Sequence, residues 1–157
     1  MAIEIERKFL VFPDLLPPLS HGQEIVQGYL SANPFLLRYR FLGKRIVMNL
    51  KKVLPDGNRF ELETEKSEST LEERQFLELM SIYPAIKKIR YKLRHESLLW
   101  ELDIYQEKNL GLITVDIELP RQDYPISFPN WVNSSADITE DPRYFNINLG
   151  KSPYTEW

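Results

Sequence analysis

Charged and apolar side chains alternate along one short segment of this chain after another, beginning with residues 4–8, Glu-Ile-Glu-Arg-Lys. Successive side chains of a β-strand point to opposite faces of its sheet. Glu4, Glu6 and Lys8 are therefore expected on one face and Ile5 on the other. The same period of two recurs through much of the chain, which predicts a sheet with one ionic face and one apolar face.

Eight segments rich in β-branched and aromatic residues, each bounded by turn-forming residues, predict eight strands. They span residues 2–10, 24–31, 35–42, 45–53, 58–65, 86–94, 98–106 and 112–119. The short links Gly43-Lys44 and Asp56-Gly57 are typical of hairpin turns, so the strands that they join are antiparallel. We expect a mainly β fold of the α+β class, a closed eight-stranded antiparallel barrel with a few peripheral helices. A β-sandwich is the competing architecture.

The remaining segments predict helices and loops. Residues 69–73, Ser-Thr-Leu-Glu-Glu, resemble a capping box and predict the start of a helix that ends before Pro84. Residues 12–23 and 120–142 contain most of the prolines and are expected to be ordered loops or short helical turns. Residues 144–149 predict a final short helix.

Composition excludes several classes of protein. The 157 residues, 43% of them hydrophobic, fit one domain, residues 1–157, and the formal charge of -3 provides no overall field that would attract nucleic acid or an anionic membrane. No run approaches the roughly 20 apolar residues that span a bilayer, so we expect a cytoplasmic protein. The chain has no cysteine and two histidines, so a bound metal would be held by oxygen.

The charges are also sorted by sign. Basic residues gather in segments 35–42, 45–53 and 86–94, and acidic residues in segments 2–10, 58–65, 98–106 and 112–119. A solvated sheet face is the simpler explanation of such alternation, but a face that serves only solubility interleaves the two signs. If the ionic face points inward, it must enclose water, cations and a polyanion, because buried unpaired charge is costly.

The residue types on this face suggest a particular chemistry. Carboxylates without histidine or cysteine select hard divalent cations such as Mg²⁺ or Mn²⁺, and arginine at alternate positions suits phosphate oxygens. Metal ions and basic side chains around a phosphate chain meet the electrostatic demand of phosphoryl transfer. Water is the simplest acceptor.

Several motifs fall in the order that one known family shows, over almost the whole chain. They are Glu4-x-Glu6-x-Lys8, Gln27-Gly28-Tyr29-Leu30, Arg38-x-Arg40, Leu50-Lys51, Glu61-x-Glu63, Lys88-x-Arg90-Tyr91, Trp100-Glu101-x-Asp103, Asp116-x-Glu118 and Ile138-Thr139 with Arg143-Tyr144. On these motifs the chain resembles the triphosphate tunnel metalloenzymes, also called the CYTH superfamily. The resemblance implies an eight-stranded antiparallel tunnel that binds a linear triphosphate with a divalent metal. The length and the QGYL segment are most similar to compact bacterial members, several of which hydrolyse inorganic tripolyphosphate.

The resemblance also implies roles for individual residues. The residues that match phosphate-gripping positions are Lys8, Arg38, Arg40, Lys51, Lys88 and Arg90. Those that match the acidic set from which metal ligands are drawn are Glu4, Glu6, Glu61, Glu63, Asp103, Asp116 and Glu118. The chain departs from the family pattern at Asp116, where glutamate is usual, at Asn49, where threonine is common, and at residues 137–139, Asp-Ile-Thr for the usual Glu-Val-Thr. These departures affect metal geometry and substrate preference.

The mechanism that we expect is hydrolysis of a terminal phosphoryl group assisted by Mg²⁺ or Mn²⁺, with Lys8, Tyr29 and Lys88 as catalytic residues. Tyr29 shares a face with Gln27 and the ionic set. A neighbouring ammonium, Lys8 or Lys88, would lower the pKa of Tyr29 and allow it to accept a proton. The alternative is that Tyr29 only packs and forms a hydrogen bond.

Other functions use a similar surface. Inside the family the alternatives are adenylate cyclisation and hydrolysis of an organic triphosphate such as thiamine triphosphate or a nucleotide. Outside it, the alternatives are a non-catalytic module that binds polyphosphate or nucleotide and a barrel that binds single-stranded nucleic acid; the carboxylates of the ionic face disfavour the latter. We expect a small-molecule triphosphate as the partner and no nucleic acid or membrane, with a homodimer as one possible assembly.

Overall fold

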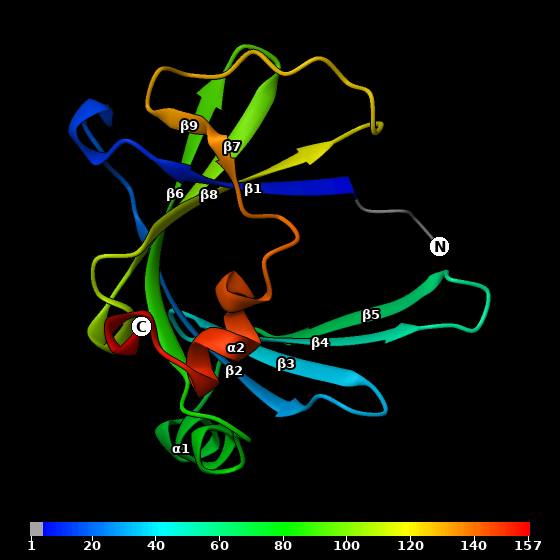
Figure 1. The fold of residues 1–157 in the computed structure, drawn as a ribbon. Coiled ribbons are helices and arrows are strands. Elements are labelled where there is room, and N and C mark those ends of the chain that lie inside the picture. Colours follow the sequence, from blue (N-terminus) through cyan, green and yellow to red (C-terminus); the bar gives the residue numbers. More distant parts are fainter. Residues whose placement is uncertain (1–4) are drawn as a thin grey trace.

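The computed structural model describes residues 5–157, with only the backbone of Arg59, and builds them around one antiparallel sheet (Figure 1). Within these residues the sheet has nine strands in the order β5-β4-β3-β2-β6-β7-β8-β1-β9. Their bounds are β1 Ile5–Val11, β2 Gln23–Ser31, β3 Leu36–Leu42, β4 Arg45–Val53, β5 Arg59–Lys66, β6 Ile86–His95, β7 Leu98–Tyr105, β8 Ile113–Leu119 and β9 Val132–Asp137. The mainly β, antiparallel prediction is confirmed.

The ninth strand and the open sheet correct the predicted closed eight-stranded barrel. Strand β9 falls in the segment 120–142, which was expected to be loop, and it pairs with β1 through a register shift. Among the described residues β5 pairs only with β4 and β9 only with β1, so the sheet ends at these two strands. Among the described residues β9 pairs with β1 at Phe9, Leu10 and Val11, and β5 does not pair with β1, so the ring of strands is not closed.

The sheet curls into two walls joined where β2 pairs with β6. In Figure 1, strands β2 to β5 form the lower wall, and β1 with β7 to β9 form the upper wall. Helix α2 (Asn146–Lys151), near the C-terminus, lies on the concave side between the walls, and helix α1 (Leu71–Leu79) lies against the outer face of the lower wall. The concave side is therefore the side that α2 and both walls share.

Helix α1 begins as its sequence predicts. Thr70 is the N-cap: its Oγ1 accepts a hydrogen bond from the Glu73 backbone N–H at 3.1 Å, and Glu73 Oε2 accepts one from the Thr70 backbone N–H at 3.0 Å. Both orphan donors of the first turn are satisfied by this capping box. In residues 5–157 we find no helix with the length and apolar composition that crossing a bilayer requires.

The main hydrophobic core lies on the apolar face of the upper wall. Phe9, Trp100, Leu102 and Val115 are fully buried there, and Trp131 covers Trp100 edge-on with ring centroids 6.0 Å apart. Trp131, just before β9, packs over this face, and Trp100 has no contact with solvent. This packing leaves the opposite face of the same strands free to carry charge.

Candidate active site

The strand registers place the predicted ionic residues on one continuous concave surface. On the upper wall Lys8 lies opposite Asp116, and Arg90 lies opposite Asp103. The lower wall has equivalent pairs. They are Tyr29 with Arg38, Gln27 with Arg40, Asn49 with Glu63 and Lys51 with Glu61. A period of two along each strand and direct pairing between strands together produce this surface.

Its most buried part is a cluster around Asp103. Lys88 Nζ donates a hydrogen bond to Asp103 Oδ2 at 2.8 Å, and Arg90 binds both oxygens, Nε to Oδ1 at 2.7 Å and Nη2 to Oδ2 at 2.8 Å. Burial opposes ionisation of the carboxyl, but the two cations outweigh it and hold the pKa of Asp103 well below its usual range. Both Asp103 oxygens are thus occupied by cationic donors.

One residue of this cluster was missed by sequence reasoning. Asn146, the first residue of α2, accepts hydrogen bonds at its Oδ1 from Lys88 Nζ at 3.2 Å and from the Tyr105 hydroxyl at 3.1 Å. The segment 144–149 was expected to be a short helix, but nothing in its sequence places that helix on the ionic face. Only the fold brings the C-terminal segment to the site.

A second chain of hydrogen bonds lies on β2 and β3. Arg40 Nε donates to Gln27 Oε1 at 2.7 Å, and Gln27 Nε2 donates to the Tyr29 hydroxyl oxygen at 2.7 Å. Burial raises the pKa of Tyr29, although Arg38 and Lys8 act in the other direction. Lys8 thus acts on the Tyr29 pKa in the expected direction, but burial outweighs it and the net shift is upward. Gln27, which we had not assigned to the site, connects the tyrosine to the arginine.

The two lysines of the site have opposite pKa shifts. Burial lowers the pKa of Lys88 to about 7, helped by Arg90 and Arg40 and opposed by Asp103. Burial acts in the same direction on Lys8, but Tyr105 and Asp116 outweigh it and raise the pKa of Lys8; its Nζ lies 3.6 Å from Asp116 Oδ1. One amine therefore remains protonated, while the other exchanges its proton near neutral pH.

Residues of the lower wall complete the surface at the edge of the sheet. Asn49 Nδ2 donates to Glu61 Oε1 at 2.8 Å, and Lys51 Nζ lies 3.5 Å from the same oxygen. Burial opposes ionisation of Glu61, but the Asn49 amide and Lys51 lower its pKa. A cavity of about 760 Å³ is lined by Lys51 of the lower wall, by Glu6 of the upper wall and by Phe145. Both walls therefore contribute to this cavity.

Two further carboxylates on the ionic face of the strands, Glu65 and Glu101, have different surroundings. Glu65 forms an exposed ion pair with Arg45 at 3.7 Å. Glu101, in contrast, accepts a hydrogen bond from Arg90 Nη1 at 3.1 Å and so extends the Asp103 cluster toward the solvent.

The acidic residues suit a hard cation by their chemistry. Glu6 and Glu118 lie directly opposite each other on β1 and β8, an arrangement of like charges that a cation would relieve. The buried Oδ1 of Asp116 accepts no hydrogen bond from the described residues. Residues 5–157 contain no group of three or more His, Asp or Glu spaced to hold a metal, but Mg²⁺ is commonly bound by one or two carboxylates together with substrate phosphates. Glu4 lies outside the described residues.

Two curated proteins are similar to the chain over nearly all of its length. An inorganic triphosphatase of Acetivibrio thermocellus is 34% identical over 155 residues, which is 98% of this chain and 97% of that protein. An inorganic triphosphatase of Nitrosomonas europaea is 33% identical over 161 residues, covering 95% of this chain and 97% of that protein. No protein-family model matches the chain.

Solved structures show the same fold. The crystal structure of the inorganic triphosphatase NE1496 superposes with a TM-score of 0.68 at 28% identity, covering 96% of this chain and 95% of that one. A Bacillus halodurans protein described as a candidate adenylate cyclase superposes with a TM-score of 0.54 at 20% identity, over 76% of this chain and 81% of that one. The second similarity concerns the fold alone.

Proposed function

The chain belongs to the inorganic triphosphatase family of the CYTH superfamily, and on this premise we propose that it hydrolyses inorganic tripolyphosphate to diphosphate and phosphate in the groove between the two walls. The observation that carries the proposal is that acidic and basic side chains of both walls share one concave surface, with Lys88, Arg90 and Asp103 joined by hydrogen bonds in its most buried part. On this surface the pKa values of Lys8 and Lys88 shift in opposite directions, and groups with separated pKa values can divide the tasks of charge stabilisation and proton transfer.

The substrate is held by cations from both walls. Arg38 and Arg40 extend from β3, Lys51 from β4 and Arg90 from β6, all on the ionic face. Guanidinium groups bind phosphate oxygens through two parallel hydrogen bonds, which fixes the orientation of a linear phosphate chain. Lys8, with its raised pKa, adds a cation that persists over the working pH range.

Lys88 is the proton acceptor in this proposal. The oxygen of a water molecule bonds to the terminal phosphorus, the bridging P–O bond breaks, and its electron pair leaves with diphosphate. The proton lost by the water passes to the neutral amine of Lys88, whose pKa of about 7 suits transfer near neutral pH. Asp103 and Asn146 hold Nζ of Lys88 in place and do not react.

This assignment changes two roles that the sequence suggested. With both oxygens bound by Lys88 and Arg90, Asp103 is better suited to positioning these cations than to binding a metal. Tyr29, whose pKa is raised, is better suited to orienting Gln27 and Arg40 than to accepting a proton. The remaining carboxylates of the ionic face are proposed to hold Mg²⁺ or Mn²⁺: Glu4, Glu6, Glu61, Glu63, Asp116 and Glu118. When bound, the metal neutralises charge on the phosphate oxygens.

A substrate panel tests the function. Phosphate release is measured with tripolyphosphate, ATP and thiamine triphosphate, and cyclic AMP is measured alongside. Each reaction is run with Mg²⁺, with Mn²⁺ and with EDTA. We expect tripolyphosphate to be cleaved fastest, with no turnover in EDTA. Cyclic AMP as the main product would overturn the proposal in favour of a cyclase, and binding of tripolyphosphate without hydrolysis would favour a non-catalytic module.

A further inference from the structure

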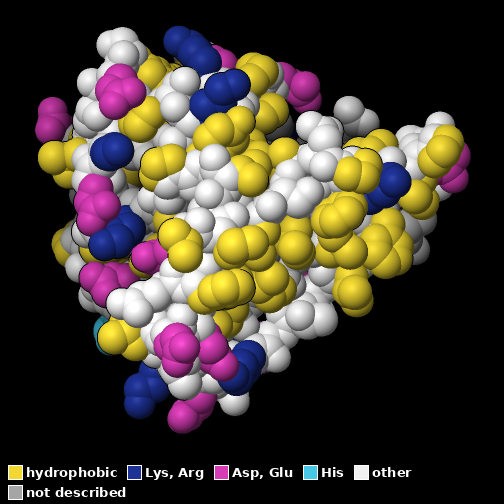
Figure 2. Space-filling view, turned by 90° about the horizontal axis from the view of Figure 1, so that it is seen from below, with side chains coloured by type: hydrophobic (Ala, Val, Ile, Leu, Met, Phe, Trp, Pro, Cys, Tyr) yellow, Lys and Arg dark blue, Asp and Glu magenta, His cyan; other side chains and the backbone are white. Residues whose placement is uncertain are grey.

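The outer face of the lower wall carries apolar side chains that the described residues 5–157 leave partly exposed. Phe60 and Leu62 of β5 are 42% and 50% exposed, and Phe76 and Leu79 of α1 are 60% and 81% exposed. Figure 2, which views the molecule from below, shows a band of hydrophobic side chains on this side. Together with Met80, which is 55% exposed, we call these residues the α1–β5 face.

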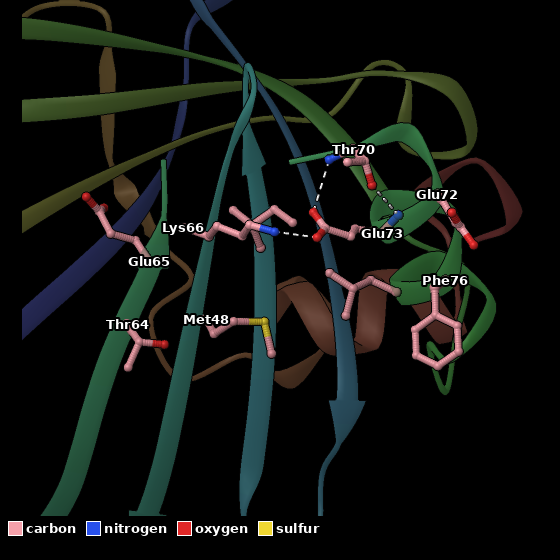
Figure 3. Close-up of a pocket in the computed structure, with 10 residues that line it drawn as sticks. Met48, Thr64, Glu65, Lys66, Thr70, Glu72, Glu73 and Phe76 are labelled. Carbon is pink, nitrogen blue, oxygen red and sulfur yellow. Dashed lines mark hydrogen bonds and ion pairs between the residues drawn. The ribbon is translucent and has the colours of Figure 1, made fainter. Parts of the chain in front are cut away.

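A groove crosses this face. It lies between α1 and the outer surface of β4 and β5, has a volume of about 730 Å³, and is seen in close-up in Figure 3. Ile46, Met48 and Thr64 of the sheet line one side, and Phe76 and Leu77 of the helix line the other. The face therefore has both a ridge, formed by exposed apolar residues of α1, and a groove beside it.

Two of the three glutamates that line the groove form ion pairs inside the chain. Glu73 pairs with Lys66, and Glu65 pairs with Arg45 at 3.7 Å; Glu72 is the third. A strongly basic partner or an anionic membrane would need free charge of one sign here. An apolar surface with a mixed-charge rim is the better match, and the same face of a second copy has these properties.

The exposed area is also of the right size. If a fully exposed side chain of this kind presents about 150 Å², the five residues expose roughly 430 Å² in each copy. A standard interface buries about 800 Å² per partner, of which about 65% is apolar in homodimers, or roughly 520 Å². The α1–β5 face thus exposes most of the apolar area that such an interface buries.

Strand β5 connects this face to the proposed active site. Its inner side carries Glu61 and Glu63, and its outer side carries Phe60 and Leu62. Because β5 pairs only with β4 among the described residues, the hairpin that carries these glutamates is supported along one edge alone. A partner against the outer side would hold the hairpin in place.

We propose that the α1–β5 face is a homodimer interface in which the α1 ridge of each copy, with Phe76 and Leu79, enters the groove of the other. A two-fold axis makes such a contact self-complementary, since each copy contributes one ridge and one groove. The dimer also steadies the β4–β5 hairpin of each active site; this second part rests on the proposed function.

The experiment measures the mass of the full chain by sedimentation over a wide range of concentration, without substrate. We expect a dimer, and we expect Leu62→Glu and Phe76→Glu to be monomeric with unchanged far-UV circular dichroism. The matched control is Leu110→Glu, which places the same charge at a leucine that is 66% exposed and outside the face; it should remain dimeric. If Leu62→Glu fails to fold, the mass of Phe76→Glu, a substitution on the exposed side of α1, decides whether the α1–β5 face forms the interface.

A wild-type chain that is monomeric throughout would overturn the interface, as would a dimer that survives both glutamate variants. Activity separates this proposal from the previous one. A monomer that hydrolyses tripolyphosphate contradicts the interface alone, and a dimer of the expected kind without hydrolysis contradicts the function alone. The monomeric variants should show a reduced kcat/KM for tripolyphosphate, while Leu110→Glu should not.

Discussion

Lys88 Nζ lies 2.8 Å from Asp103 Oδ2, and the exposed fractions of the two side chains are 1% and 0%. Arg90 closes the other side of the same carboxylate. A buried carboxylate shared by two cations holds both of them in fixed positions. Removing it would leave Lys88 without its buried carboxylate partner, while Arg90 would retain Glu101 at 3.1 Å and Asp116 at 3.8 Å.

Asp103→Asn is therefore expected to destabilise the fold by about 3 to 5 kcal/mol, the usual cost of breaking a buried ion pair by removing one partner. Urea unfolding followed by circular dichroism measures this change in the free energy of unfolding. Glu101→Gln is the control, because that carboxylate binds Arg90 from a more exposed position and its loss should cost much less. A loss below about 1 kcal/mol for Asp103→Asn would contradict the assigned role.

The pH dependence of kcat/KM tests Lys88. Its pKa of about 7 means that the amine is protonated below neutral pH and neutral above it, so its capacity to accept a proton increases as the pH rises. We expect kcat/KM for tripolyphosphate to rise through about pH 7 and to lose this limb in Lys88→Arg, which stays charged. Any pH dependence of kcat/KM that remains in Lys88→Arg reports the ionisation of the substrate itself. A fall in kcat/KM over this range in the wild type would assign Lys88 to phosphate binding.

Tyr29→Phe should lower kcat only modestly. The hydroxyl accepts one hydrogen bond from Gln27, worth about 1 kcal/mol, and burial raises its pKa away from that of a base at neutral pH. We expect a change in kcat of no more than about tenfold. A decrease of a hundredfold or more, together with the loss of a pH-dependent limb, would restore Tyr29 as the proton acceptor.

Substitutions of Asn146 test whether α2 controls the active-site lysine. Asn146→Asp places a carboxylate beside Lys88 Nζ, which stabilises the ammonium and should move the limb of the kcat/KM profile to higher pH. Asn146→Ala removes the contact without adding charge, so it should leave that limb nearer its original position while lowering kcat. Identical profiles for both variants would show that Asn146 has no electrostatic influence on Lys88.

A pair of variants separates metal binding from phosphate binding. Glu118→Gln removes one of two opposed carboxylates and should raise the Mg²⁺ concentration needed for half-maximal activity. Arg38→Ala should raise KM for tripolyphosphate and leave the Mg²⁺ requirement nearly unchanged. For each variant, Mg²⁺ is titrated at saturating tripolyphosphate, and tripolyphosphate is titrated at saturating Mg²⁺. Equal effects of both variants on both titrations would contradict this division of roles.

The alternation of side chains located eight strands and their ionic face because a period of two is a local property of sequence. Strand β9 escaped detection, since its sequence, Val-Asn-Ser-Ser-Ala-Asp, is mostly polar and its pairing depends on the distant edge of β1. The capping box of α1 was readable for the same local reason as the first eight strands.

Properties that depend on burial were not readable in this way. The alternation of side chains along β2 places Tyr29 on the same face as the cations. It does not reveal how deeply the ring is buried, and burial decides the direction of the pKa shift of Tyr29. The contact of Asn146 with Lys88 joins residues 58 positions apart and follows only from the path of the C-terminal segment. The absence of pairing between β5 and β9 likewise depends on which strands pair in the folded sheet, and this is not a local property of the sequence.

The lack of pairing between β5 and β9 gives the molecule the form of a trough. A pipe admits a linear chain only by its end, so the chain must be threaded. In the described sheet no hydrogen bonds join the last strands, so the proposed substrate and its products would not have to be threaded past a closed ring of strands.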